Sequence, residues 1–177
     1  MSAGILQFWF TEIQPAQHWK KDPAFDQLIA ERFGELHAQA ARCELFSWRA
    51  TPEGRLAEII VLDQFSRNIY RDQPGAFAQD PLALALAQEA VALGADQALP
   101  PAQRGFVYML YMHSESLLIH DQALPLFEAL NPQQLDFEIK HRDIVARFGR
   151  YPHRNAILGR ESTPEELAFL EQPGSSF

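Results

Sequence analysis

Five prolines directly follow a residue of the type that caps helices, and this pairing constrains the fold more than any other feature of the sequence. The pairs are Asp22-Pro23, Thr51-Pro52, Asp80-Pro81, Asn131-Pro132 and Thr163-Pro164. An Asp, Asn or Thr side chain accepts a hydrogen bond from the first helical turn, and proline suits the first helical position because it has no N–H to satisfy. Each pair therefore predicts the start of a helix, and Leu99-Pro100-Pro101 predicts a further start.

A helix-length amphipathic run follows these starts. The runs cover residues 23–43, 52–70, 81–93, 101–120 and 132–149. A further segment, 116–130, contains Pro125, which breaks or kinks a helix, and Gly94 and Gly149 stand where helices commonly end. The sequence thus predicts an all-α fold of seven or eight helices, and its short connections favour antiparallel neighbours.

The length and composition fit one domain. With 177 residues, 47% of them apolar, the chain can bury one core, so we expect a single domain over 1–177 with 171–177 as a short polar tail. Cys43 falls within a helical pattern and is expected to be a small buried residue. A lone cysteine agrees with a reducing compartment, so we expect a cytoplasmic protein.

Charge and hydropathy restrict the partners. The net charge of −8 argues against general nucleic-acid binding, which needs a basic face. The apolar start has no preceding basic residue and is too short to span a bilayer, so we expect no membrane association. The sequence leaves the oligomeric state open.

The predicted helix 52–70 carries two charged residues on an apolar stripe. The stripe consists of Leu56, Ile59, Ile60, Asp63 and Arg67. Because Leu62, Phe65 and Ile69 form a second stripe, this helix is expected to be buried. Asp63 and Arg67 are four residues apart and can form an ion pair. Alternatively, Arg67 points to a ligand, and Asp63 orients Arg67 or a histidine.

Two more helices place histidines on apolar stripes. His113 shares a stripe with Phe106 and Leu110 and is followed by Glu115; the stripe of the next helix consists of Phe137, His141, Ile144, Val145 and Phe148. A single inward histidine is commonly a hydrogen-bonded core residue, whereas His113, His141, Asp63 and Glu115 together are candidate catalytic residues. Their spacing matches no compact metal motif, so we predict neither a metal nor a cofactor. His18, His37 and His120 are expected at the surface or the edge of the core.

A basic segment stands out in this acidic chain. Residues 140–160 contain six Lys or Arg residues and one acid. Arg147 and Arg150 suit the C-terminal dipole of a helix, and residues 151–155 must form a turn because Gly149 and Pro152 end that helix. Arginine is the preferred donor to phosphate and carboxylate groups. The candidate ligand-binding residues are Arg67, Arg147, Arg150, His153, Arg154 and Asn155. Alternatively, Arg154 and Arg160 cap carbonyls or pair with acids.

Several motifs resemble one family over essentially the whole chain. They are "FWF", "LAEIIVLDQFSRNIYRDQPGAFAQD", "YMHSES" and "HRDIVARFGRYPHRNAILGRESTPEE". On these motifs the chain is similar to the bacterial domain-of-unknown-function 924 family. The resemblance implies an all-helical, TPR-like array with a groove or pocket, and it transfers no catalytic role. Tyr151 stands where many relatives are expected to have phenylalanine.

Three functional hypotheses follow. The first is a binding module whose polar pocket holds an anionic small molecule or the acidic end of a peptide. The second is an enzyme, a hydrolase or transferase acting on a phosphate- or carboxylate-bearing substrate, with His113 or His141 as general acid or base. The third makes the polar residues a structural network that connects helices.

Overall fold

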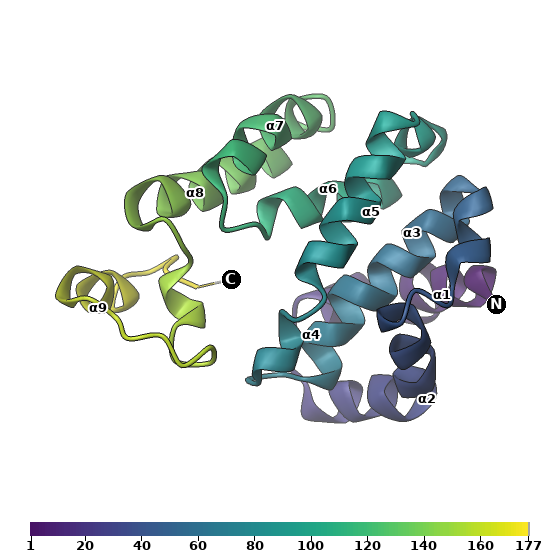
Figure 1. Cartoon of the computed structure of the whole chain (residues 1–177), viewed down its shortest axis with the longest axis horizontal. Coiled ribbons are helices and arrows are strands. Elements are labelled where there is room, and N and C mark those ends of the chain that lie inside the picture. Colours follow the sequence, from purple (N-terminus) through teal and green to yellow (C-terminus); the bar gives the residue numbers. More distant parts are fainter. Residues whose placement is uncertain (177) are drawn as a thin grey trace. The chain divides into compact units, whose positions relative to one another are not determined.

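The computed structural model describes residues 1–176, which contain helices and connecting segments and no β-strand. The helices are α1 (Ser2–Gln7), α2 (Pro23–Ala41), α3 (Pro52–Ile60), α4 (Ser66–Ile69), α5 (Asp80–Ala92), α6 (Pro101–Met112), α7 (Leu117–Glu128), α8 (Pro132–Phe148) and α9 (Pro164–Leu170) (Figure 1). The predicted all-α class is confirmed. Over the same residues, no helix combines the length and the apolar character needed to cross a membrane.

The helix starts follow the capping residues, with one exception. The side chains of Asp22, Thr51, Asn131 and Thr163 each accept a hydrogen bond from a backbone N–H in the first turn. Asp80 does not cap α5, which starts one residue earlier than predicted. Its carboxylate instead accepts two hydrogen bonds from Arg67, at 3.0 and 3.1 Å. A tertiary ion pair therefore replaces a local cap.

The chain divides into two compact units. Unit 1 comprises Met1–Arg71 and Gly75–Leu110, and unit 2 comprises Asp72–Pro74 and the chain from Tyr111 onward. In unit 1, α3 continues through a π-helical turn (η4, Val61–Phe65) into α4, so the predicted helix 52–70 forms one rod with a wider turn inside it. This rod packs against α1, α2 and α5, and its apolar residues from Leu56 to Phe65 are fully buried, whereas Ile69 is only partly buried. π-helical turns within α-helices are frequent at functional sites.

Unit 2 is built on α7 and α8, which lie side by side (Figure 1). A short 3-10 turn (η7, Pro152–Arg154) follows α8 and packs against α9. Ile144, Val145 and Tyr151 form a core cluster, against which Phe148 and Phe169 pack. The turn predicted for residues 151–155 is thus present and contributes Tyr151 to the core.

The prediction of one helix over 101–120 is wrong, because the helix is interrupted in its second half. α6 ends at Met112 and α7 begins at Leu117, so residues 113–116 form a loop. Serine side chains compete for backbone hydrogen bonds, and Ser114 Oγ accepts one from the Ser116 N–H at 3.2 Å. His113 therefore lies in a loop and is half-buried.

Two residues that were expected to be buried are exposed. Cys43 is exposed with a φ of 59°, because α2 ends at Ala41 and the cysteine lies in the turn that leaves the helix. Phe137 is 45% exposed although it shares the predicted stripe with His141, which is buried. The exposed Lys140 ammonium lies 5.6 Å from the centroid of the Phe137 ring, so this ring contacts a charged side chain at the surface.

Candidate functional site

Asp63 and Arg67 lie within unit 1 and form the ion pair that their spacing predicts. Arg67 Nη1 is 2.6 Å from Asp63 Oδ1, and Gln64 Nε2 donates to Asp63 Oδ2 at 2.6 Å. Burial lowers the pKa of the Arg67 guanidinium, but the charges of Asp63 and Asp80 outweigh this effect and raise it. The two carboxylates thus hold Arg67 in place and balance its charge.

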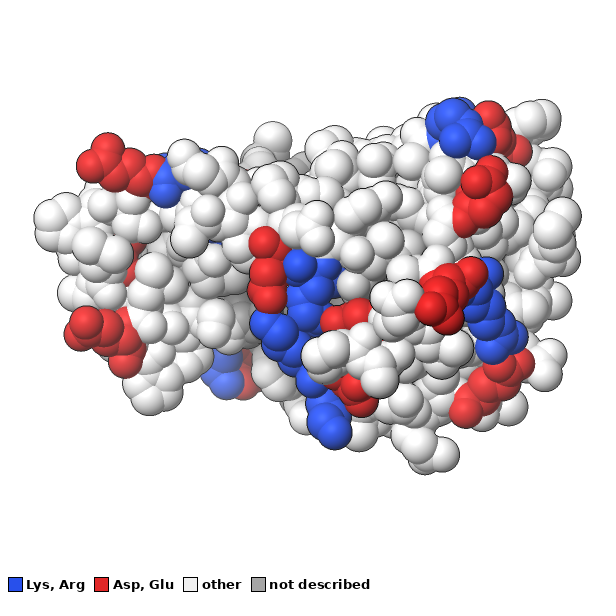
Figure 2. Space-filling view, turned by 90° about the horizontal axis from the view of Figure 1, so that it is seen from below, with Lys and Arg blue, Asp and Glu red and all other residues white. Residues whose placement is uncertain are grey.

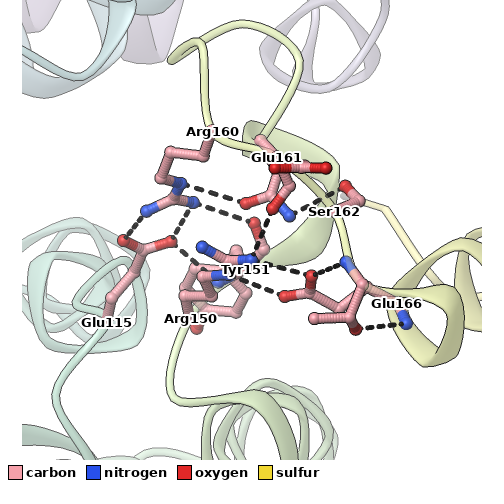
Figure 3. Close-up of polar contacts among 9 residues, drawn as sticks. Glu115, Arg150, Tyr151, Arg160, Glu161, Ser162 and Glu166 are labelled. Carbon is pink, nitrogen blue, oxygen red and sulfur yellow. Dashed lines mark hydrogen bonds and ion pairs between the residues drawn. The ribbon is translucent and has the colours of Figure 1, made fainter.

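Glu115 organises the loop that follows α8 in unit 2 (Figure 3). Arg160 donates to both of its oxygens, at 2.6 and 2.8 Å, and the Tyr151 backbone N–H donates to Oε1 at 2.7 Å. Burial raises the pKa of Glu115, but these hydrogen bonds outweigh burial and hold it below its ordinary value. Arg160 also donates to the Tyr151 carbonyl at 3.2 Å. Glu115 therefore connects the α6–α7 loop to residues 151–160.

Arg150 and Arg147 at the end of α8 each bind a glutamate at the start of α9. Arg150 donates to both oxygens of Glu166 at 2.7 and 2.8 Å, and Arg147 donates to Glu165 Oε1 (Figure 3 shows Arg150 and Glu166). The Arg150 hydrogen bonds lower the pKa of Glu166 to about 2. Glu166 also accepts from the Thr163 N–H at 2.8 Å and so completes a capping box at the start of α9.

Asn155 is buried and connects the two halves of the same loop. Its side-chain oxygen accepts from Arg160 Nε at 3.0 Å, and its amide nitrogen donates to Ser162 Oγ at 3.0 Å. Both contacts lie inside unit 2. The alternative in which Arg154 and Arg160 cap carbonyls or pair with acids therefore describes Arg160, which binds Glu115 and the Tyr151 carbonyl. Arg147 and Arg150, which were expected to interact with the helix dipole, pair with acids as well.

A different environment surrounds the buried ring of Tyr151. The Arg154 guanidinium lies over this ring, 4.7 Å from its centroid, and Arg154 is itself buried. The rings of His153, His141 and His120 lie 5.6, 5.9 and 6.3 Å from the ring of Tyr151, centroid to centroid. These side chains come from α7, α8 and η7, so tertiary packing brings together three histidines and an arginine.

Burial and mutual repulsion keep two of these imidazoles neutral. Burial, assisted by the charges of His113, His120 and His153, lowers the pKa of His141 to about 3. Burial and the charge of Arg154 lower the pKa of His153 to about 4. His141 Nδ1 donates to the Phe137 carbonyl at 2.7 Å, one turn back in α8. The surroundings of Tyr151 therefore disfavour any additional positive charge.

His120 and Glu138 form an interior pair that the sequence did not predict. Both are fully buried, and His120 Nδ1 lies 2.7 Å from Glu138 Oε1. His37 is also buried, with its Nε2 2.7 Å from Ser66 Oγ, so the surface or edge prediction was wrong for both histidines. Glu138 precedes His141 by three residues on the same stripe of α8, and this spacing was the available signal.

Ion pairing also characterises the surface. On the face shown in Figure 2, Lys and Arg side chains lie beside Asp and Glu side chains. Across residues 1–176, no group of three or more His, Cys, Asp or Glu side chains has the arrangement needed to hold a metal ion.

Comparisons with known proteins identify the family. No curated protein matches the chain. A solved structure of a protein of unknown function from Agrobacterium tumefaciens has 43% sequence identity and a TM-score of 0.91, with 96% of each chain covered. The family model described as "Bacterial protein of unknown function (DUF924)" matches residues 5–174. The chain therefore belongs to the DUF924 family of bacterial proteins.

Proposed function

We propose that the protein is a cytoplasmic binding module, and that unit 2 holds an anionic group of a small molecule or of a peptide end beside Arg154 and His153. The observation that carries the proposal is the gathering of Arg154, His153, His141 and His120 around the ring of Tyr151. An arginine and imidazole N–H groups can donate charge-assisted hydrogen bonds to a phosphate or carboxylate.

The contacts of the other arginines narrow the proposed site. Arg147, Arg150 and Arg160 donate to Glu165, Glu166 and Glu115, so their charges are balanced within unit 2. Around Tyr151, Arg154 lowers the pKa of both His153 and Glu115, which is the effect of a positive local potential. An incoming anion would lower that potential.

The geometry favours binding over catalysis. A general acid or base must reach the reacting group of a substrate. His141 is buried and donates through Nδ1 to a carbonyl of its own helix. His120 is in contact with the Glu138 carboxyl group, the Ser114 carbonyl and Tyr151 Oη. Binding a ligand does not require these imidazoles to exchange a proton with it, whereas general acid or base catalysis does.

A thermal-shift experiment tests the proposal. Inorganic phosphate, acetate and citrate, each compared with chloride at equal ionic strength, should raise the melting temperature of the wild type, and Arg154→Gln should abolish the rise. Arg147→Gln is the matched control, because it removes the same charge from an exposed ion pair. An equal shift in all three proteins would indicate a general salt effect and contradict the proposal, as would no shift in any of them.

Anion binding should also be linked to proton uptake at His153. Its pKa is lowered to about 4 by burial and by the charge of Arg154, and the negative charge of a bound anion offsets the effect of Arg154. Binding should therefore raise the pKa of His153, and affinity should increase as the pH falls from 7 toward 5. An NMR titration of the histidine ring signals, with and without phosphate, measures this change. An unchanged His153 titration in the presence of bound phosphate would place the anion elsewhere.

A further inference from the structure

His120 of α7 and Glu138 of α8 form a polar pair in an interior from which water is excluded. Both side chains have 0% exposure, and 2.7 Å separates His120 Nδ1 from Glu138 Oε1. Within residues 1–176, Glu138 Oε2 is buried and has no hydrogen-bond partner. An ionised carboxylate in such a position is costly, because each of its oxygens needs hydrogen bonds that replace water.

The hydrogen bonds around the pair determine how many protons it holds. His120 Nε2 lies 2.9 Å from the Ser114 carbonyl oxygen, which can only accept, so Nε2 carries a hydrogen and donates it. Tyr151 Oη cannot supply that hydrogen, because it donates to the Met112 carbonyl at 2.5 Å. It lies 3.2 Å from His120 Nε2 and is a second acceptor for the same N–H.

The contact between Nδ1 and Glu138 then requires one more proton. Without it, an Nδ1 lone pair would face a carboxylate oxygen at 2.7 Å, and the two acceptors would repel each other. Moving the Nε2 hydrogen to Nδ1 does not solve the problem, because the Nε2 lone pair would then face the Ser114 oxygen. One proton therefore lies between the histidine and the glutamate, whichever of the two holds it.

We infer that this shared proton connects α7 to α8, and that unit 2 contains a pH-sensitive device that loosens when the proton is lost at alkaline pH. Loss of the proton leaves a buried negative charge and two facing acceptors at the main helix contact of the unit. Protein interiors tolerate such a charge poorly, so the helices separate locally to admit water.

The surrounding groups are compatible with this behaviour. Burial raises the pKa of Glu138, although hydrogen bonding to His120 and the charges of His120 and Arg142 act in the opposite direction. The titratable or charged groups that act on the pair directly are Arg142 and His141 from α8 and Tyr151 from the segment after α8. Around His141 and Tyr151 lie four further such groups, which are His113 and Glu115 from the α6–α7 loop and His153 and Arg154 from η7. The neutral forms of His141 and His153 add no positive charge that would hold a Glu138 carboxylate.

Glu138→Gln tests the inference directly. The glutamine amide donates permanently to His120 Nδ1 and so replaces the shared proton by one that does not titrate. Hydrogen exchange of the α7 and α8 amides, corrected for the intrinsic pH dependence of exchange, should show protection that falls above neutral pH in the wild type and stays constant in Glu138→Gln. Glu165→Gln, which changes an exposed glutamate of the same unit, should behave as the wild type.

A measurement on the wild type covers the case in which Glu138→Gln does not fold. NMR of isotope-labelled histidine and glutamate side chains should show one proton held between His120 Nδ1 and Glu138 Oε1, and its loss should accompany the loss of protection in α7 and α8. Two results would overturn the inference. One is an ionised Glu138 beside a neutral His120 already at neutral pH, and the other is an equal loss of protection with pH in the wild type and in Glu138→Gln.

Discussion

Replacing Glu115 with alanine is expected to destabilise unit 2 by about 3 kcal/mol, since hydrogen bonds to charged groups contribute roughly 1.5–3 kcal/mol each and are not additive. Glu115 accepts two hydrogen bonds from Arg160 and one from the Tyr151 backbone N–H. The substitution also leaves a half-buried guanidinium without its carboxylate. Urea unfolding at pH 7, followed by circular dichroism, measures the change.

The control for this prediction is Glu165→Ala. Glu165 also binds an arginine, but both side chains of that pair are largely exposed, and exposed pairs contribute roughly 0–1 kcal/mol. A double-mutant cycle with Arg160→Ala should assign most of the loss to the Glu115–Arg160 interaction. If Glu115→Ala costs no more than Glu165→Ala, the loop after α8 is held by apolar packing, and Glu115 is not its anchor.

Acid should destabilise the protein through His141 and His153. Their pKa values in the folded chain are lowered to about 3 and about 4, whereas an unfolded histidine has its ordinary value of 6.5. The unfolded chain therefore binds more protons between these values. The stabilisation is complete above pH 6.5 and is lost progressively as the pH falls toward 4 and then 3. At about 1.4 kcal/mol per pKa unit, each residue should cost roughly 3 kcal/mol by pH 4, and the two together on the order of 6 kcal/mol.

Comparison with His141→Gln/His153→Gln separates this effect from the acids. Carboxylates such as Glu166, whose folded pKa is lowered to about 2, also lose stabilisation in acid, but they do so in both proteins. Urea unfolding of both proteins at a series of pH values from 7 to 4 should show a clearly smaller loss in the double variant. Equal losses would mean that the two histidines titrate normally in the folded chain.

The helices and most of their ends could be predicted because local chemistry sets them. Thr163 caps α9 as predicted, and Gly149 ends α8 with a φ of 69°. Asp63 and Arg67 pair as their spacing indicates, since neighbours four apart on a helix need no tertiary contact to meet. The loop at residues 113–116 was missed because the apolar pattern of α6 continues into α7 without a proline or glycine between them.

The partners of the charged residues could not be predicted. Arg160 and Glu115 are 45 residues apart, and so are Arg71 and Asp26. Such pairs depend on which helices pack together and at what angle, and a single sequence does not encode that in any local spacing. For the same reason His120 was expected near the surface. Its partner Glu138 lies on the neighbouring helix, and no local spacing connects the two residues.

The sequence alone determined that the chain is helical, where most helices begin, and that polar groups lie on its buried stripes, because capping and periodicity are properties of a few adjacent residues. Only the tertiary structure decided what those groups do. It assigned glutamates to Arg147, Arg150 and Arg160, and it placed Arg154 and three histidines around Tyr151. The sequence shows directly which side chains carry a charge. The oppositely charged partners of Arg147, Arg150 and Arg160 come from elsewhere in the chain and are brought to them by packing.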